Sequence, residues 1–139
     1  MQILNPHDKF FKETFGRISL AKEYLHQHLP ASVSRIVDLD TLEPQKDSFI
    51  NKGLRESFSD LLFKAEIDQR EGYIYFLFEH KSQPSRDIAF QLLRYMVEIW
   101  NAKMSKEETC ALPVIVPLVV YHGKKGWEMQ TMGDLVPGF

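Results

Sequence analysis

Two apolar runs on either side of a polar turn constrain the fold more than any other feature of the sequence. The runs cover residues 58–63 and 73–78, and the polar turn between them reads Asp68-Gln69-Arg70-Glu71-Gly72. This pattern predicts an antiparallel β-hairpin with a loop of roughly three to five residues. If the hairpin is centred between Gln69 and Arg70, Asp60 lies directly opposite Glu79, with their Cβ atoms about 5 Å apart.

Two carboxylates and one ammonium group would then converge at the end of the hairpin. Lys81 lies two residues past Glu79 and therefore points to the same face of the strand. Like charges that face each other destabilise a sheet, so a divalent cation between Asp60 and Glu79 is the simplest interpretation. A second interpretation stays open, in which Asp60 and Lys81 form an ordinary cross-strand ion pair and Glu79 is solvated at the strand end.

The cation hypothesis assigns a role to each residue near the strand end. Mg²⁺ or Mn²⁺ would take oxygen ligands, two of them from Asp60 and Glu79. The side chain of His80 is expected on the opposite face, which leaves its backbone carbonyl as a third ligand. The metal would act on a phosphate or activate a water, and Lys81 would hold that water or offset negative charge in the transition state.

Three further side chains are candidates for supporting roles. Gln91 and Tyr95 are four residues apart and share one face of a predicted helix, so Gln91 would bond a metal-bound water or a phosphate and Tyr95 would support it. The alternative is that Tyr95 belongs to the core and Gln91 to its boundary. Glu13 is either an outer carboxylate of the site or part of a solvated helix face.

The rest of the chain predicts an α/β fold. Helices are expected over residues 7–29, in two pieces, and over residues 87–104. Strands are expected over residues 35–43 and 113–121, and residues 44–53 are expected to form a polar loop. The second hairpin strand is apolar on both faces, which is typical of a central strand. The last strand follows a helix and should run parallel to a neighbour, with Pro117 at an edge or a bulge. The result is a mixed central sheet with helices on both faces.

Composition limits the class of protein. The 139 residues suffice for one domain, and the net charge of -2 excludes a strongly basic coat for nucleic acid but not a local patch. Cys110 is the only cysteine, so an intramolecular disulfide is impossible and a cytoplasmic setting is expected. No signal peptide is recognised, and the longest apolar run is about half of the ~20 residues that span a bilayer, so no membrane partner is expected.

Five sequence passages, in this order and spacing, carry a family resemblance. They are residues 7–15, 59–63, 78–82, 91–96 and 117–123, and they include Asp60, Glu79-x-Lys81 and Gln91-x-x-x-Tyr95. The set resembles the PD-(D/E)xK nuclease superfamily, with a Gln-x-x-x-Tyr element similar to that of its RecB-like branch. The five passages together are similar to the family of recombination-promoting nucleases, also called YhgA-like putative transposases.

The resemblance implies an αβββαβ core over residues 1–127, with 128–139 as a tail or the start of a longer continuation. It implies a metal-dependent DNA endonuclease that is linked to recombination or mobile elements. DNA would be the partner, and the chain could form a homodimer. Asp60 and Glu79 become metal ligands, Lys81 the catalytic lysine, and Gln91 and Tyr95 auxiliary residues. Family members often have Gln where this chain has Lys81. The rival hypothesis is a non-catalytic DNA-binding or dimerising regulatory module on the same fold.

Overall fold

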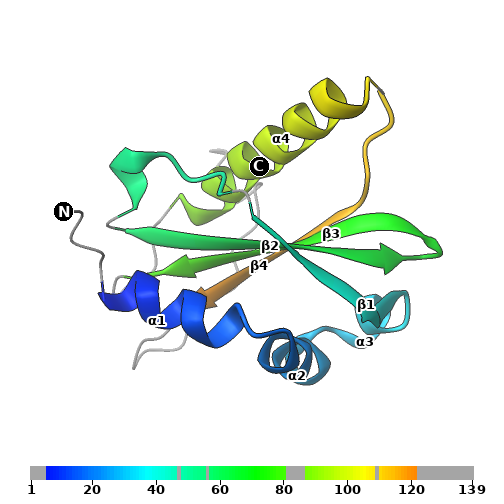
Figure 1. The fold of residues 1–139 in the computed structure, drawn as a ribbon, viewed down its shortest axis with the longest axis horizontal. Coiled ribbons are helices and arrows are strands. Elements are labelled where there is room, and N and C mark those ends of the chain that lie inside the picture. The colour runs from blue at the N-terminus through cyan, green and yellow to red at the C-terminus, as the bar shows by residue number, and fades with distance from the viewer. Residues whose placement is uncertain (1–5, 47, 56, 81–86, 109, 122–139) are drawn as a thin grey trace, which may run out of the picture.

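A four-stranded sheet with the strand order β1-β2-β3-β4 forms the centre of the protein (Figure 1). The structure, a computed structural model, describes residues 6–46, 48–55, 57–80, 87–108 and 110–121. The strands are β1 (Val37–Gln45), β2 (Phe58–Ile67), β3 (Arg70–Glu79) and β4 (Ile115–Tyr121). β1, β2 and β3 pair antiparallel, whereas β3 and β4 pair parallel, so the predicted mixed α/β sheet is confirmed.

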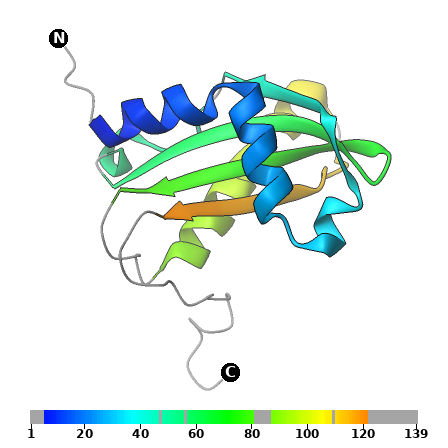
Figure 2. The ribbon, with the colours of Figure 1, turned by 90° about the horizontal axis from the view of Figure 1, so that it is seen from below.

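Helices cover both faces of the sheet, as expected from the sequence (Figures 1 and 2). α1 (Pro6–Phe15), α2 (Ile18–His28) and the short α3 (Ala31–Ser34) lie on one side, and α4 (Ile88–Glu107) lies on the other. We call the first side the α1 face; its core includes Phe11, Leu25, Phe63, Ile74 and Phe76. The second side is the α4 face; its core includes Leu62, Tyr75, Leu77, Tyr95 and Ile99.

The strand that was predicted to be central is central. β3 lies between β2 and β4, and its residues 73–79 are all buried, because helices cover both of its faces. β4 is an edge strand, which confirms the expectation from Pro117. The Tyr73 N–H donates to the Val114 carbonyl over 2.8 Å. Backbone groups alternate in direction along a strand, so the Pro117 nitrogen lies on the open edge, where its missing N–H breaks no ladder bond.

The hairpin loop is shorter than predicted. Ile67 pairs with Arg70, so the loop consists of Asp68 and Gln69 alone, with φ values of 52° and 64°. Positive φ at both positions is typical of a type I′ turn, whose twist matches that of the flanking strands. Gly72 was placed in the loop by the sequence but lies in β3. There a Cβ atom would come within 2.7 Å of Ile67 Cδ1 and 3.0 Å of the backbone oxygen of Val114, so close packing explains this glycine.

Other element boundaries differ by a few residues from those predicted. β1 continues through Pro44 to Gln45 on the other edge of the sheet, α4 extends to Glu107, and α3 was not predicted. β1 also contains an irregularity in pairing between Asp38 and Glu43. The predicted domain boundary at residue 127 and the tail lie outside the described residues. In the described part of the chain, no helix has the length and apolar character needed to cross a bilayer.

The turn makes a direct prediction about stability. Gln69 holds a left-handed conformation that glycine adopts without steric cost, so Gln69→Gly should stabilise the protein by about 0.5–1 kcal/mol. Gln69→Ala keeps the Cβ atom and is the matched control, for which no gain is expected. Urea unfolding followed by circular dichroism measures both variants. A Gly variant less stable than the Ala variant would contradict the assigned turn.

Candidate functional site

The two acids singled out by the sequence lie on the same face of the sheet but are not directly opposite each other. Asp60 pairs with Leu77, and Glu79 pairs with Phe58, so the predicted register is wrong by two residues. The cause is that the turn is centred between Asp68 and Gln69, one residue earlier than predicted. A shift of two residues preserves the alternation of side chains, so both acids still point to the α4 face. They are diagonal neighbours, with Cβ atoms roughly 7 Å apart rather than about 5 Å.

Both acids are buried. The exposed fraction is 3% for Asp60 and 0% for Glu79. A buried carboxylate needs hydrogen bonds, a counter-charge or a metal ion, because desolvation of a charge is costly. The sequence-based alternative in which Glu79 is solvated at the strand end is therefore wrong.

Three donors hold the carboxylate of Asp60. Ser48 donates its hydroxyl to Oδ1 over 2.6 Å, the Phe49 N–H donates to Oδ2 over 2.7 Å, and the Tyr75 hydroxyl donates to Oδ2 over 2.8 Å. Two of these donors belong to the segment between β1 and β2, and the third belongs to β3. Asp60 thus joins that segment to the centre of the sheet, in one fixed orientation.

Two tyrosines surround this carboxylate on the α4 face. Burial raises the pKa of Tyr75, and the negative charge of Asp60 raises it further, so its hydroxyl stays protonated as a donor. Tyr95 on α4 lies against it, with ring centroids 6.2 Å apart. Burial raises the pKa of Tyr95 to about 12, so this hydroxyl is also protonated at neutral pH.

The side chain of His80 points away from the acids, as predicted. Its Nε2 atom lies 2.6 Å from the hydroxyl oxygen of Ser59, and both side chains are buried. Ser59 pairs with Phe78, whose side chain belongs to the core of the α1 face. The Ser59–His80 contact therefore fastens the ends of β2 and β3 on the face opposite the acids. The role of the His80 backbone carbonyl as a metal ligand stays a prediction.

The remaining predicted site residues have other surroundings. Lys81 lies outside the described residues. Gln91 donates to Asp87 over 3.0 Å and accepts from Arg94 over 3.2 Å, so its described partners lie on α4 or at its N-cap. Glu13 is exposed on α1 and forms an ion pair with Lys9 over 3.9 Å. The structure therefore brings Tyr95, but neither Gln91 nor Glu13, into the described surroundings of Asp60.

The donor set suits a hard cation that keeps most of its water. Asp60 and Glu79 supply carboxylate oxygens on one face, and Oδ1 of Asp60 accepts a single hydrogen bond in the described part, which leaves it acceptor capacity. Among the described residues, no group of three or more His, Cys, Asp or Glu could hold a metal. Mg²⁺ is commonly bound by one or two carboxylates with waters and substrate phosphates, so these two residues fit it.

Comparison with known proteins decides the family. The family model described as "Putative transposase, YhgA-like" matches residues 5–134. The chain belongs to the YhgA-like family. The match covers every helix and strand of the described residues, including both acids, so the resemblance seen in the sequence is confirmed.

Curated relatives of this YhgA-like chain carry nuclease names. It is 38% identical to the recombination-promoting nuclease RpnA of Escherichia coli (strain K12) over 122 residues, which are 88% of this chain and 41% of the relative. It is 32% identical to the recombination-promoting nuclease RpnD of Escherichia coli O157:H7 over 120 residues, 86% of this chain and 46% of the relative. It is 36% identical to the "Inactive recombination-promoting nuclease-like protein RpnE" of strain K12 over 120 residues, 86% of this chain and 40% of the relative.

The YhgA-like chain spans less than half the length of these three relatives. No solved structure matches it.

Three partners of Asp60 were not predicted from the sequence, namely Ser48, Phe49 and Tyr75. Tyr75 could have been found from the register, because it lies two residues before Leu77 on the α4 face. Ser48 and Phe49 lie in a segment without periodicity and gave no sequence signal.

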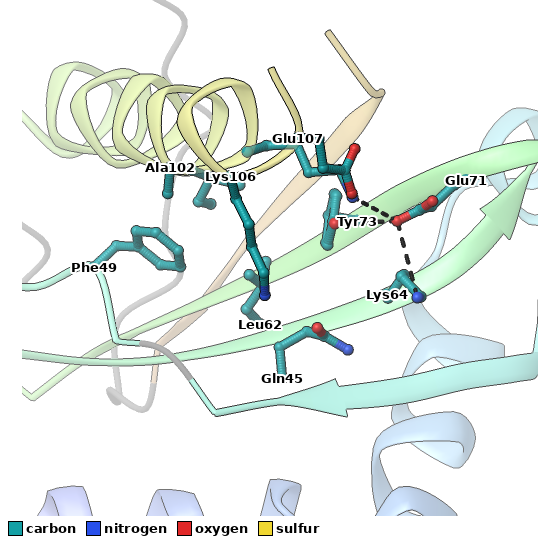
Figure 3. A pocket seen from close by; sticks show the side chains of 11 residues that line it. Gln45, Phe49, Leu62, Lys64, Glu71, Tyr73, Ala102, Lys106 and Glu107 are labelled. Atoms are coloured by element: carbon teal, nitrogen blue, oxygen red, sulfur yellow. Dashed lines mark hydrogen bonds and ion pairs between the residues drawn. The ribbon is translucent and has the colours of Figure 1, made fainter. Parts of the chain in front are cut away.

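A separate pocket of the YhgA-like domain lies toward the hairpin turn (Figure 3). It has a volume of about 220 Å³ between α4 and strands β2 and β3. Lys103 from α4 bridges Glu71 at 2.8 Å and Glu107 at 2.6 Å, and Lys64 lies 3.9 Å from Glu71. Lys64 and Lys103 thus have carboxylate partners, and we call Lys64, Glu71, Lys103 and Glu107 the ion-pair cluster. Lys106 also lines this pocket.

Removal of the Asp60 carboxylate should destabilise the protein. Asp60→Ala leaves the Phe49 N–H and the Tyr75 hydroxyl without their acceptor, and the expected loss is about 2–5 kcal/mol. Asp38→Ala is a control at an exposed acid on the neighbouring strand β1, with an expected loss below about 1 kcal/mol. Chemical unfolding measures both. Equal stability of the two variants would show that the Asp60 hydrogen bonds do not form.

The ion-pair cluster makes a prediction about pH. Its hydrogen bond with Lys103 lowers the pKa of Glu71 below the usual 4.5. A lowered folded-state pKa stabilises the fold above the unfolded-state value, and this contribution is lost as the pH falls through the folded-state value. Wild type should therefore exceed Glu71→Gln in unfolding free energy at pH 7 by up to about 1 kcal/mol, because Glu71 is half exposed. Near pH 3 the difference should shrink, and a difference that grows there would contradict the pairing.

Proposed function

We propose that this domain is a metal-dependent nuclease that hydrolyses phosphodiester bonds of DNA, in recombination or the movement of mobile elements. The observation that carries the proposal is the burial of Asp60 and Glu79 on one face of adjacent strands. Two buried carboxylates on one face favour a cation between them, because each would otherwise raise the cost of ionising the other.

Each residue of the site has a task in this reaction. The hydrogen bonds from Ser48, Phe49 and Tyr75 fix Asp60, so that little reorganisation is needed when a ligand binds. Bound Mg²⁺ or Mn²⁺ would supply Lewis acidity toward the phosphate and lower the pKa of a water. Lys81, two residues past Glu79 in sequence, would place a positive charge beside the phosphate.

The substrate class comes from the relatives. RpnA and RpnD are named recombination-promoting nucleases, which supports DNA as the partner. The single cysteine fits a reducing cytoplasm, where DNA is accessible. A homodimer would bring two such sites to one duplex, which fits the expectation from the sequence.

One observation favours a second candidate, a non-catalytic DNA-binding or dimerising module. RpnE, at 36% identity, is named inactive, so the family fold also occurs in a protein described as having no activity. Three protein donors on Asp60 would also be compatible with a purely structural carboxylate. Metal binding separates the two candidates, because only the nuclease requires it.

Nicking of supercoiled plasmid tests the proposal. Wild type with Mg²⁺ should nick the plasmid and EDTA should abolish nicking. Glu79→Gln should lower the rate at least about 100-fold, since it removes a carboxylate charge with little change of shape. Glu66→Gln changes an exposed glutamate on β2 and is the matched control, with an unchanged rate.

Calorimetric titration with Mn²⁺ accompanies the nicking assay. Wild type and Glu66→Gln should bind Mn²⁺, and Glu79→Gln should bind it more weakly by about tenfold or more. Equal nicking by all three proteins would reject the nuclease. DNA binding in the absence of any Mn²⁺ binding would favour the non-catalytic module.

A further inference from the structure

One side of α4 carries large apolar side chains that the rest of the domain leaves exposed. The exposed fraction is 46% for Phe90, 39% for Leu93 and 50% for Val97. With about 3.6 residues per turn, these three lie on the side of the helix opposite Tyr95 and Ile99, which are buried against the sheet. In Figure 1, α4 lies at the outside of the domain, and no other described helix or strand lies beyond it. The helix therefore has a second apolar side that faces away from its own sheet.

The apolar residues on this side follow the seven-residue repeat of helices that pack on other helices. The repeat comprises Phe90, Leu93, Val97, Trp100 and Met104, which are three and four residues apart in turn, and we call them the outer stripe. The last two are half-buried. Such spacing is that of the narrow seam of a coiled coil, whereas a helix that packs on a sheet needs a wider apolar face. The outer stripe therefore fits another α-helix.

One flank of the outer stripe carries an exposed arginine and an exposed glutamate. Arg94 and Glu98 are one helical turn apart, and both line the cavity that borders residues 48–51, so they point to the same flank. Arg94 donates a hydrogen bond to Gln91 over 3.2 Å. Within the described part of the chain, neither Arg94 nor Glu98 forms an ion pair. A helix on the outer stripe that carries a matching acid and base would pair with both.

A second copy of α4 has these charges at the required spacing. When two identical helices pack antiparallel about a two-fold axis, each flank faces the same flank of the other copy. If Leu93 faces Val97 of the second copy, Arg94 lies about 3 Å along the helix axis from the level of Glu98 of that copy. This register also brings the two Arg94 side chains near the axis, where the acid on either side offsets their repulsion. The flank is thus complementary to itself in charge.

We propose that α4 forms a homodimer interface, in which the outer stripes of two copies pack antiparallel and Arg94 pairs with Glu98 across the two-fold axis. Phe90 then packs on Trp100 of the second copy, and Leu93 packs on Val97 of that copy. Such a contact closes after two copies, so a dimer and not a filament is expected. One pair of helices is a small interface, so the dissociation constant should be on the order of micromolar. The pairing requires neither metal nor DNA, so its test is independent of the proposed nuclease activity.

Two matched leucine variants test the interface. Sedimentation velocity over a concentration series in the micromolar range, in EDTA and without DNA, measures the dissociation constant of the dimer. Leu93→Glu puts a charge into the middle of the outer stripe and should raise that constant by at least about tenfold. Leu20→Glu makes the same change at a leucine of α2 that is 36% exposed on the other side of the sheet, and it should dimerise like wild type.

Thermal unfolding at a concentration where wild type is monomeric is the control for folding. Leu93→Glu and Leu20→Glu should melt alike, because both leucines are exposed in the monomer. A much lower melting temperature of Leu93→Glu alone would mean that another part of its own chain covers the outer stripe, which would overturn the proposal. A wild type that stays monomeric throughout the series would also overturn it, as would a dimer that Leu93→Glu leaves unchanged.

Exchange of the two charges tests the antiparallel register. Arg94→Glu and Glu98→Arg should each raise the dissociation constant about three- to tenfold, because like charges then face each other. The double variant restores opposite charges across the axis and should dimerise nearly as well as wild type. In a parallel pair each residue would face its own copy, and the double variant would gain nothing. Single variants without effect, or a double variant as weak as the two single effects combined, would therefore overturn the proposal.

Discussion

The pairing of β2 with β3 is the interaction on which the rest of the structure depends. The turn at Asp68 and Gln69 sets its register, and the register decides which side chains share a face. A shift by one residue would send Asp60 and Glu79 to different faces, whereas the observed shift by two residues only moves them from opposite to diagonal positions. The two acids therefore share one face in the predicted register and in the observed one. Cβ atoms about 7 Å apart still leave room for a cation between the two carboxylates.

Asp60 connects this hairpin to the less regular part of the chain. Its carboxylate accepts hydrogen bonds from Ser48, from the Phe49 N–H and from Tyr75, so it fixes the position of the segment between β1 and β2 against β3. The same side chain thus has a structural and a proposed catalytic role, which means that activity and stability change together when it is replaced. Glu79 is the better residue for separating the two, because a Gln substitution keeps its shape.

The sequence predicted those features that follow from periodicity. The central position of β3 came from apolar residues on both of its faces, and the edge position of β4 came from Pro117. The placement of both acids on one face of the sheet was also predicted, because the alternation of side chains survives the shift in register. The two-residue length of the turn was not predicted, because Gly72 is the usual signal for a loop and here serves close packing in β3. The hydrogen bonds of Asp60 could not be predicted, because Ser48 and Phe49 approach it from a segment without periodicity.

The central claim is that Asp60 and Glu79 share one cation on the α4 face. A crystal grown or soaked with Mn²⁺ and measured near the manganese absorption edge tests it most directly. The account predicts an anomalous peak between the two carboxylates, at about 2.0–2.3 Å from an oxygen of each. A peak bound by one acid alone, or its absence from this part of the sheet at saturating Mn²⁺, would contradict the claim.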